Sequence, residues 1–332
     1  MKAIVSSPQG AIPADIADPV PGPGEALVRL RAGLVLPGDV RAARTLSHGL
    51  ALGQAFVGTV EGLGPQALAS PAASRPKDAK AWLGKRVAVH PLVRCGRCDR
   101  CLGGLSAHCR ERTILGVDGR SGGFAERVAV PLSNLLLLPD ALDDDRAVFA
   151  VPVAAALEAT RHVRIEGKTY ITVLGDGATT LVTAQVMSRL NAAVRIVARE
   201  RGTLAAAEKL GVKHRHADEI GRRGDQDVVV DCVGTAESLA FAAQLVRARG
   251  TIVLTVATTG AAVPADLSPI VLNELRVQGS SYGPLADAVD LLAKRAAEVI
   301  SLIERKATLA EASTAFRLAA EPGRLAVVLR GA

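Results

Sequence analysis

The spacing of hydrophobic and polar positions divides the chain into a strand-rich first part and a second part in which strands and helices alternate. Residues 26–31 alternate between apolar and polar side chains with a period of two, which is typical of a half-buried strand. Residues 56–61 and 85–90 also predict strands. Residues 65–80, rich in Ala, Pro, Ser and Lys, predict an exposed loop between them.

From about residue 145, apolar runs alternate with segments of helical periodicity. The pattern predicts strands at 170–174, 194–198, 227–231 and 251–255, and helices at 147–163, 181–190 and 204–210. Strands that alternate with helices predict a parallel sheet with crossover helices. A further helix near 309–319 and a final strand at 325–330 follow. The expected fold class is therefore α/β.

Composition narrows the class of protein. The chain has 332 residues, of which 49% are hydrophobic and 22% charged, so we expect a globular protein with two domains. The net charge is +7, but the 40 basic residues are spread along the chain among 33 acidic ones. We therefore expect no nucleic-acid partner. Because no apolar run reaches about 18 residues, and residues 1–6 carry no signal-peptide pattern, we expect a cytoplasmic protein without membrane contact.

Four of the five cysteines lie within fifteen residues. Cys95, Cys98, Cys101 and Cys109 have a spacing that can close around one zinc ion, with four thiolates in a tetrahedral arrangement. The alternatives are a disulfide-bonded or metal-free loop, and a nucleic-acid-binding zinc ribbon, which usually separates its two Cys pairs by about 15–20 residues. A full thiolate shell predicts one structural zinc per chain. Cys232, at the end of an apolar strand, is expected to be a buried, inert thiol.

A glycine-rich turn joins the expected strand at 170–174 to the following helix. This is the position at which a dinucleotide pyrophosphate meets a helix N-terminus. We expect Gly175, Asp176, Gly177 and Thr180 to form the cofactor-binding turn, with Thr180 in place of the usual third glycine. The alternative is a doubly wound domain that no longer binds a cofactor.

The end of the next strand, at residues 194–198, selects the cofactor. An acidic residue there would bind the ribose 2′-hydroxyl of NAD, but Ala198 is small and uncharged. Arg199 and Arg201 can pair with a 2′-phosphate, so we expect NADP rather than NAD. Glu200, in the same segment, leaves NAD open as the alternative.

The order of these motifs resembles the medium-chain dehydrogenase/reductase superfamily, in its zinc-dependent alcohol dehydrogenase-like branch. The resemblance extends over nearly the whole chain, and its motifs lie at residues 21–25, 53–60, 90–109, 122–126, 173–177, 279–284 and 320–324. It implies a GroES-like β-rich catalytic domain at 1–142, a zinc lobe at about 90–112, a Rossmann domain at 143–279 and a return to the catalytic domain at 280–332. It also implies a homodimer or homotetramer.

The residues at the superfamily's catalytic-zinc positions depart from its pattern. The resemblance implies a Cys at the first position, where this chain has Leu36 or Val35, a His at Gln54 and a later Cys or Glu at Val151. The usual proton-relay hydroxyl falls at Gly38, which has no side chain. Apolar side chains cannot coordinate zinc, so we expect the catalytic zinc to be lost.

Three interpretations of the function remain open. The first is an alcohol dehydrogenase-like oxidoreductase that transfers hydride with NADP(H) and without catalytic zinc; its proton donor is unknown, and Tyr282, His48 and Asp39 are candidates by chemistry. The second is a non-catalytic nucleotide-binding protein that keeps the fold and the structural zinc. The third is a metal-dependent alcohol dehydrogenase with a rebuilt ligand set from Asp39, His48 and His90.

Overall fold

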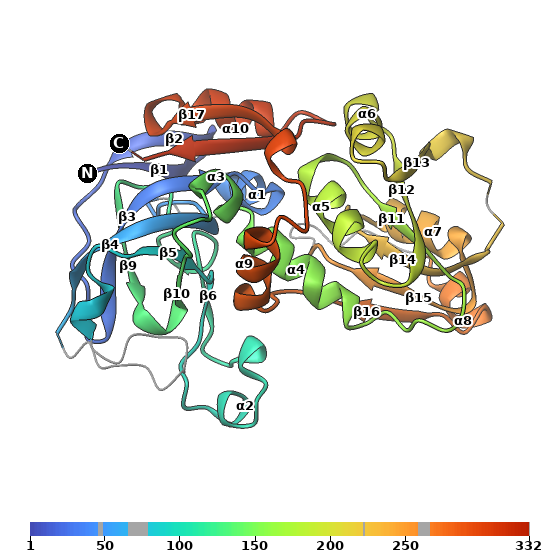
Figure 1. The fold of residues 1–332 in the computed structure, drawn as a ribbon, viewed down its shortest axis with the longest axis horizontal. Coiled ribbons are helices and arrows are strands. Elements are labelled where there is room, and N and C mark those ends of the chain that lie inside the picture. The colour runs from blue at the N-terminus through green and yellow to red at the C-terminus, as the bar shows by residue number, and fades with distance from the viewer. Residues whose placement is uncertain (46–48, 66–78, 222, 258–265, 332) are drawn as a thin grey trace.

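The computed structural model describes residues 1–45, 49–65, 79–221, 223–257 and 266–331, and arranges them around two large sheets that lie side by side (Figure 1). The first sheet is mostly antiparallel, and its order is β10 (Leu135–Leu137), β5 (Arg86–Val89), β4 (Ala55–Leu63), β3 (Glu25–Leu34), β18 (Ala326–Arg330) and β17 (Ile303–Thr308), with β9 (Arg127–Pro131) also paired to β3. The strands expected in the first part are confirmed. Most of the expected loop at 65–80 lies outside the described residues.

Smaller elements complete this part of the molecule. They are the hairpin β1 (Lys2–Ser7) and β2 (Gly10–Asp15), the helices α1 (Pro37–Thr45) and α10 (Ala312–Ala319), and a small sheet of β6 (Leu92–Val93), β7 (Thr113–Leu115) and β8 (Gly119–Arg120). The short helix α2 (Asp99–Leu102) belongs to a lobe that projects away from the sheet, at the bottom of Figure 1.

The second sheet has six parallel strands. Their order is β13 (Lys213–His216), β12 (Ala192–Ala198), β11 (Thr169–Leu174), β14 (Gln226–Asp231), β15 (Val246–Leu254) and β16 (Arg276–Gly279). The strand that comes first in the sequence lies at the centre, and the order reverses beside it. This is the doubly wound arrangement in which ligands bind at the carboxyl ends of the central strands. The expected α/β fold class is confirmed.

Helices cover this sheet and join it to the first one. They are α3 (Asp144–Ala147), α4 (Ala150–Thr160), α5 (Gly177–Met187), α6 (Arg201–Lys209), α7 (Ala236–Leu245), α8 (Ser268–Leu272) and α9 (Leu285–Ala293). Helices α4 and α9 lie between the two sheets (Figure 1). One apolar cluster contains Leu34 of the first sheet, Val153 of α4 and Ile171 of the second sheet. The sheets therefore share a core, and the cleft between them is held in a defined geometry.

A membrane-spanning element is absent from the described part of the chain. No helix there combines the length and the apolar character needed to cross a bilayer.

Candidate functional site

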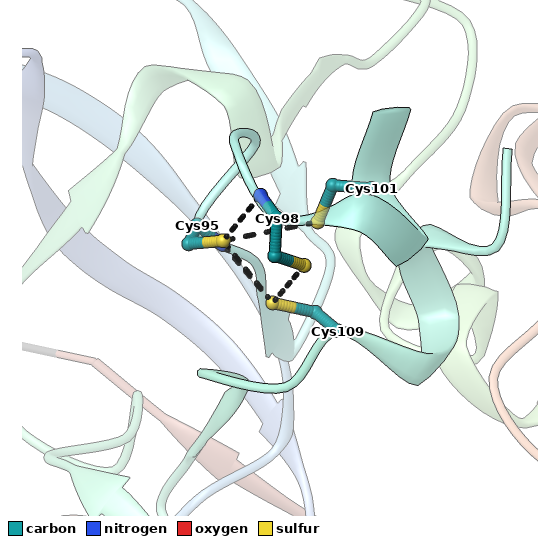
Figure 2. Close-up of side chains that lie close together, drawn as sticks. All are labelled: Cys95, Cys98, Cys101 and Cys109. Atoms are coloured by element: carbon teal, nitrogen blue, oxygen red, sulfur yellow. Dashed lines mark hydrogen bonds between the residues drawn. The ribbon is translucent and has the colours of Figure 1, made fainter. Parts of the chain in front are cut away.

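The four clustered cysteines meet in the projecting lobe. Their sulfur atoms all lie within 4.8 Å of one another (Figure 2). The Sγ atom of Cys109 is 3.5 Å from that of Cys95 and 3.9 Å from that of Cys98, and the Sγ atoms of Cys95 and Cys101 are 4.0 Å apart. Four thiolates at about 2.3 Å from a central zinc would be separated by roughly 3.8 Å. The cysteines therefore fit one tetrahedral zinc ion.

Backbone amides donate hydrogen bonds to two of these sulfur atoms. The amide of Cys95 donates to Cys109 Sγ, and the amide of Cys98 donates to Cys95 Sγ, each at 3.4 Å. The amide of Arg110 is the main reason why the pKa of Cys98 falls to about 6. Hydrogen bonds from N–H groups favour the thiolate, which is the form that binds zinc.

The glycine turn lies between β11 and α5, as expected. Gly175 has a φ of +136°, and a Cβ atom there would lie 2.8 Å from the Oγ1 atom of Thr180. Gly177 has a φ of +81°, and its missing side chain faces the carbonyl oxygen of Arg324. Both positions therefore require glycine. The turn borders a cavity of about 180 Å³ between α5 and the segment that precedes β18.

The side chains of Asp176 and Thr180 hold this turn in place through hydrogen bonds to backbone groups. The Asp176 carboxylate accepts the amides of Arg199 at 3.3 Å and Glu200 at 3.0 Å, which fixes the turn to the end of β12. Thr180 is fully buried, and its hydroxyl donates to the carbonyl oxygen of Asp176 at 3.1 Å. Thr203, which the sequence analysis missed, accepts the amide of Gly177 at 2.9 Å.

A basic pocket adjoins the end of β12. Strand β13 pairs with β12 so that Arg215 lies opposite Val197, and a cavity of about 460 Å³ opens beside Arg201, Arg215 and His216. Within the described residues, Arg199, Arg201 and Arg215 form no ion pair with a carboxylate, although Glu219 lines the same cavity and His216 Nδ1 lies 3.6 Å from Asp218 Oδ2. Arg215 and His216 were not predicted, although the basic run Lys213–His216 could have indicated them.

The three positions of the expected catalytic-zinc site face the region between the sheets. Leu36 packs against the same apolar cluster as Val151, whereas Val35 belongs to the core of the first sheet. Which of the two, Leu36 or Val35, stands at the first position stays a prediction. A Cβ atom at Gly38 would lie 2.7 Å from the Nε2 atom of Gln54, so the amide of Gln54 fills the space of the missing hydroxyl.

Asp39 is fully buried beside Gln54. Its carboxylate accepts the amide of Leu36 at 2.9 Å, the amide of Gln54 at 3.1 Å and the side-chain nitrogen of Gln54 at 3.4 Å. Burial raises the pKa of Asp39 to about 6. Asp39 lies in the first turn of α1, and its carboxylate accepts the amide of Leu36, the residue that precedes the helix. Asp39 therefore caps the N-terminus of α1.

Tyr282 reaches the same amide from the segment after β16. Its hydroxyl donates to the Oε1 atom of Gln54 at 3.5 Å, and its ring centroid lies 6.0 Å from that of His90. The Nδ1 atom of His90 accepts the amide of Leu92 at 3.2 Å. His48, the other candidate, lies outside the described residues. Across the described ranges, only the four-cysteine group has the geometry of a metal site built from His, Cys, Asp or Glu.

Cys232 follows β14 and lies close to the glycine turn. Burial raises the pKa of its thiol to about 11, and the hydroxyls of Thr255 and Thr183 are hydrogen-bonding neighbours. Cys232 as a residue is partly exposed rather than fully buried. Its inertness stays a prediction, because a thiol that remains protonated is a weak nucleophile.

Two family models match the chain. Residues 22–140 match the alcohol dehydrogenase GroES-like domain, and residues 178–298 match the zinc-binding dehydrogenase family. The chain belongs to the zinc-dependent, alcohol dehydrogenase-like branch of the medium-chain dehydrogenase/reductase superfamily. The expected GroES-like part and Rossmann-like parallel sheet of this superfamily are both present.

Curated relatives in this superfamily are dehydrogenases. The 2-dehydro-3-deoxy-L-galactonate 5-dehydrogenase of Pseudoalteromonas atlantica is 27% identical over 70% of this chain and 72% of its own length. The L-idonate 5-dehydrogenase of Vitis vinifera is 26% identical over 78% of the chain and 73% of its own length. The L-threonine 3-dehydrogenase of Stenotrophomonas maltophilia is 27% identical, and the chain spans 55% of it. These relatives indicate an alcohol or polyol dehydrogenase-like oxidoreductase.

Solved structures of the superfamily share the whole fold. A protein from Sinorhizobium meliloti 1021, classed as a zinc-binding dehydrogenase and solved with NADP bound, is 28% identical with a TM-score of 0.84, and the match covers 99% of this chain and 98% of that one. An alcohol dehydrogenase from Thermus sp. ATN1 has a TM-score of 0.85 at 23% identity, with complete coverage of both chains. The latter likeness concerns the fold alone.

Proposed function

We propose that this protein is an NADP(H)-linked oxidoreductase that transfers hydride without a catalytic zinc. The observation that carries the proposal is the cleft between the two sheets, where Leu36, Gln54 and Val151 occupy the superfamily's ligand positions. Of the three, only Gln54 has lone pairs to offer, and its amide is hydrogen-bonded to Asp39. Catalytic zinc needs three protein ligands and one open position. An incompletely coordinated dication beside Leu36 and Val151 would be strongly disfavoured.

The single zinc belongs in the projecting lobe. There it would be held by Cys95, Cys98, Cys101 and Cys109, which leave no open coordination position. Its contribution is structural, because the lobe is remote in sequence from the glycine turn and the four thiolates already fill the shell. We therefore infer one zinc ion per chain.

The cofactor end of the second sheet suits NADP(H) better than NAD(H). Ala198 supplies no carboxylate for the ribose 2′-hydroxyl, while Arg199, Arg201 and Arg215 lack carboxylate partners within the described residues. Arginine side chains are the usual partners of a phosphate group. The NADP-bound neighbour from Sinorhizobium meliloti supports the same choice. Gly175 and Gly177 allow close approach of the pyrophosphate, and bound NADPH would supply the hydride.

A second candidate is a nucleotide-binding protein without catalysis. The observation that favours it is the amide of Gly177, which would face a pyrophosphate but instead donates to Thr203. A protein of this kind would bind NADPH and reduce no carbonyl compound. We rank it second because the cleft retains polar groups at Gln54 and Tyr282 that a purely structural interface does not require.

We further propose a homodimer or homotetramer. Among the described strands, β16 lies at the edge of the parallel sheet and pairs on one side only, and the neighbouring helix α8 exposes Val271 and Leu272 to 73% and 81%. Exposed apolar side chains beside an open sheet edge favour association between chains.

Titration of nucleotide fluorescence tests the proposed cofactor. Wild-type protein should bind NADPH at least about ten times more tightly than NADH. Arg199→Ala and Arg215→Ala should each weaken NADPH binding by about 1.5–3 kcal/mol, because a direct bond to a charged phosphate is lost, and leave NADH binding unchanged. Arg317→Ala, an exposed arginine on α10, is the control. Tighter binding of NADH than of NADPH would contradict the proposal.

A further inference from the structure

Three residues from distant parts of the sequence meet in the cleft. The Tyr282 hydroxyl lies 3.5 Å from Gln54 Oε1, and Gln54 Nε2 lies 3.4 Å from Asp39 Oδ1. The superfamily places its catalytic metal and its proton-relay hydroxyl in this region, at the positions of Leu36, Gln54 and Gly38. The chain therefore has a continuous polar network where the usual ligands are missing.

Hydrogen bonding sets the direction of this network. The Asp39 carboxylate is already an acceptor for the backbone amides of Leu36 and Gln54. When ionised, it only accepts, so Gln54 must turn its NH₂ group toward Asp39. The carbonyl oxygen of Gln54 then faces Tyr282, and the tyrosine hydroxyl must be the donor. Its bond to Gln54 is long, so a better acceptor can replace it.

The position of the tyrosine ring is closely constrained. Gly283, the next residue, lies so close to α4 that a Cβ atom there would be 1.9 Å from the carbonyl oxygen of Ala154. On its other side, the Tyr282 ring faces His90, and both rings line a cavity of about 330 Å³. Burial raises the pKa of Tyr282 to about 12, so the hydroxyl remains protonated at neutral pH. A fixed, protonated donor therefore lies at the edge of a cavity large enough for a small ligand.

We propose that the hydroxyl of Tyr282 binds the carbonyl oxygen of the substrate and donates the proton that accompanies hydride transfer. This inference rests on the proposed function and names its catalytic residue. Gln54 and Asp39 are positioning residues, because they act on the substrate through Tyr282. The substrate class is an aldehyde, ketone or quinone small enough to enter the cavity beside the Tyr282 ring.

The chemistry balances without a metal. When bound, NADPH would be the reductant: it would supply the hydride and leave as NADP⁺. The carbonyl carbon gains a C–H bond, the π electron pair of C=O moves to oxygen, and that oxygen takes the proton of Tyr282. In a quinone, the new C–H bond then loses its proton to water as the second carbonyl takes up a proton and the ring becomes the hydroquinone. Water returns a proton to the tyrosinate. A positioned donor at a developing oxyanion is typically worth a factor of about 10²–10³ in rate.

The chain offers a matched pair of variants, because it contains two tyrosines. Tyr282→Phe removes only the proposed donor, and Tyr170→Phe removes a partly exposed hydroxyl on β11. The carbonyl probes are 4-nitrobenzaldehyde, phenylglyoxal and 9,10-phenanthrenequinone, each with NADPH. The inert probe is benzamide, whose carbonyl oxygen accepts a hydrogen bond but is not reduced.

Tyr282→Phe should lower kcat for the best carbonyl probe about 100-fold and weaken benzamide binding about 10-fold, measured by calorimetry. Its melting temperature and its Kd for NADPH should equal those of wild type, and Tyr170→Phe should match wild type throughout. If Tyr282→Phe matched Tyr170→Phe in both kcat and benzamide affinity, the role of Tyr282 would be refuted while the proposed function stood. If wild-type protein did not bind NADPH, the proposed function would fail, and the benzamide comparison would still decide whether Tyr282 binds a carbonyl oxygen.

Discussion

Asp39 is the residue that anchors the polar network of the cleft, and its burial makes a measurable difference to stability. The pKa of Asp39 is raised from an unfolded-state value near 3.8 to about 6. Between these two values the unfolded chain loses its proton while the folded chain keeps it. Folding therefore becomes less favourable as the pH rises from about 4 to about 6.

Asp39→Asn should remove this pH dependence, because the amide does not titrate. Between pH 4 and pH 6, the free energy of unfolding of wild type should fall relative to that of Asp39→Asn by about 2 kcal/mol. Urea unfolding at pH 4, 5, 6 and 7 measures both proteins, and their difference cancels the titration of all other groups. Curves that remain parallel over this range would show that burial does not shift Asp39.

For single positions in the cleft, the sequence predicts whether a side chain can bind a metal but not which other side chains it contacts. The resemblance predicts that Leu36 or Val35, Gln54 and Val151 stand where the superfamily has metal ligands, because apolar side chains cannot coordinate zinc. The sequence does not show that Tyr282 reaches Gln54, since 228 residues separate them and only the tertiary fold brings them together.

At the scale of elements, the zinc lobe is held by its cysteines rather than by a hydrophobic core. Helix α2 has four residues, none of them buried, and Leu102 and Leu105 are 76% and 59% exposed. An element that buries so little apolar surface cannot offset the entropy lost on ordering its backbone. A metal held by the four cysteines would supply the missing free energy.

Cys98→Ser should therefore unfold the lobe locally. Hydrogen–deuterium exchange followed by mass spectrometry should show loss of protection across residues 95–112, with protection of the parallel sheet and the Kd for NADPH unchanged. Cys232→Ser, which removes a thiol outside the lobe, is the control and should keep the lobe protected. Full protection of the lobe in Cys98→Ser would refute a stabilising metal.

The central elements followed from the hydrophobic pattern, and the edge strands did not. β11, β12 and β14 are buried on both faces and consist of apolar runs. Strand β13, with the sequence Lys-His-Arg-His, and the fully exposed β16 have no such pattern, because an edge strand is held by the backbone of its neighbour. The positions of β13 and β16 follow from their pairing with β12 and β15. A short stretch of sequence does not contain this information.

At the scale of the whole molecule, the fold of the dehydrogenase superfamily is retained, and we propose that the chemistry of its cleft is changed. The chain crosses from the first sheet to the parallel sheet and returns through β17 and β18, so the cleft is bounded by both. The glycine turn and the four-cysteine lobe keep the residue types that their functions need. The catalytic-metal positions instead hold Leu36, Gln54 and Val151, which leads to the central claim of hydride transfer without a catalytic zinc.

The zinc content of the purified wild-type protein, measured by native mass spectrometry, tests this claim most directly. The account predicts one zinc ion per chain, bound by the cysteine lobe, and none in Cys98→Ser. Two zinc ions per chain in wild type, or one that remains bound when Cys95, Cys98, Cys101 and Cys109 are all replaced by Ser, would place a metal elsewhere in the molecule and contradict the account.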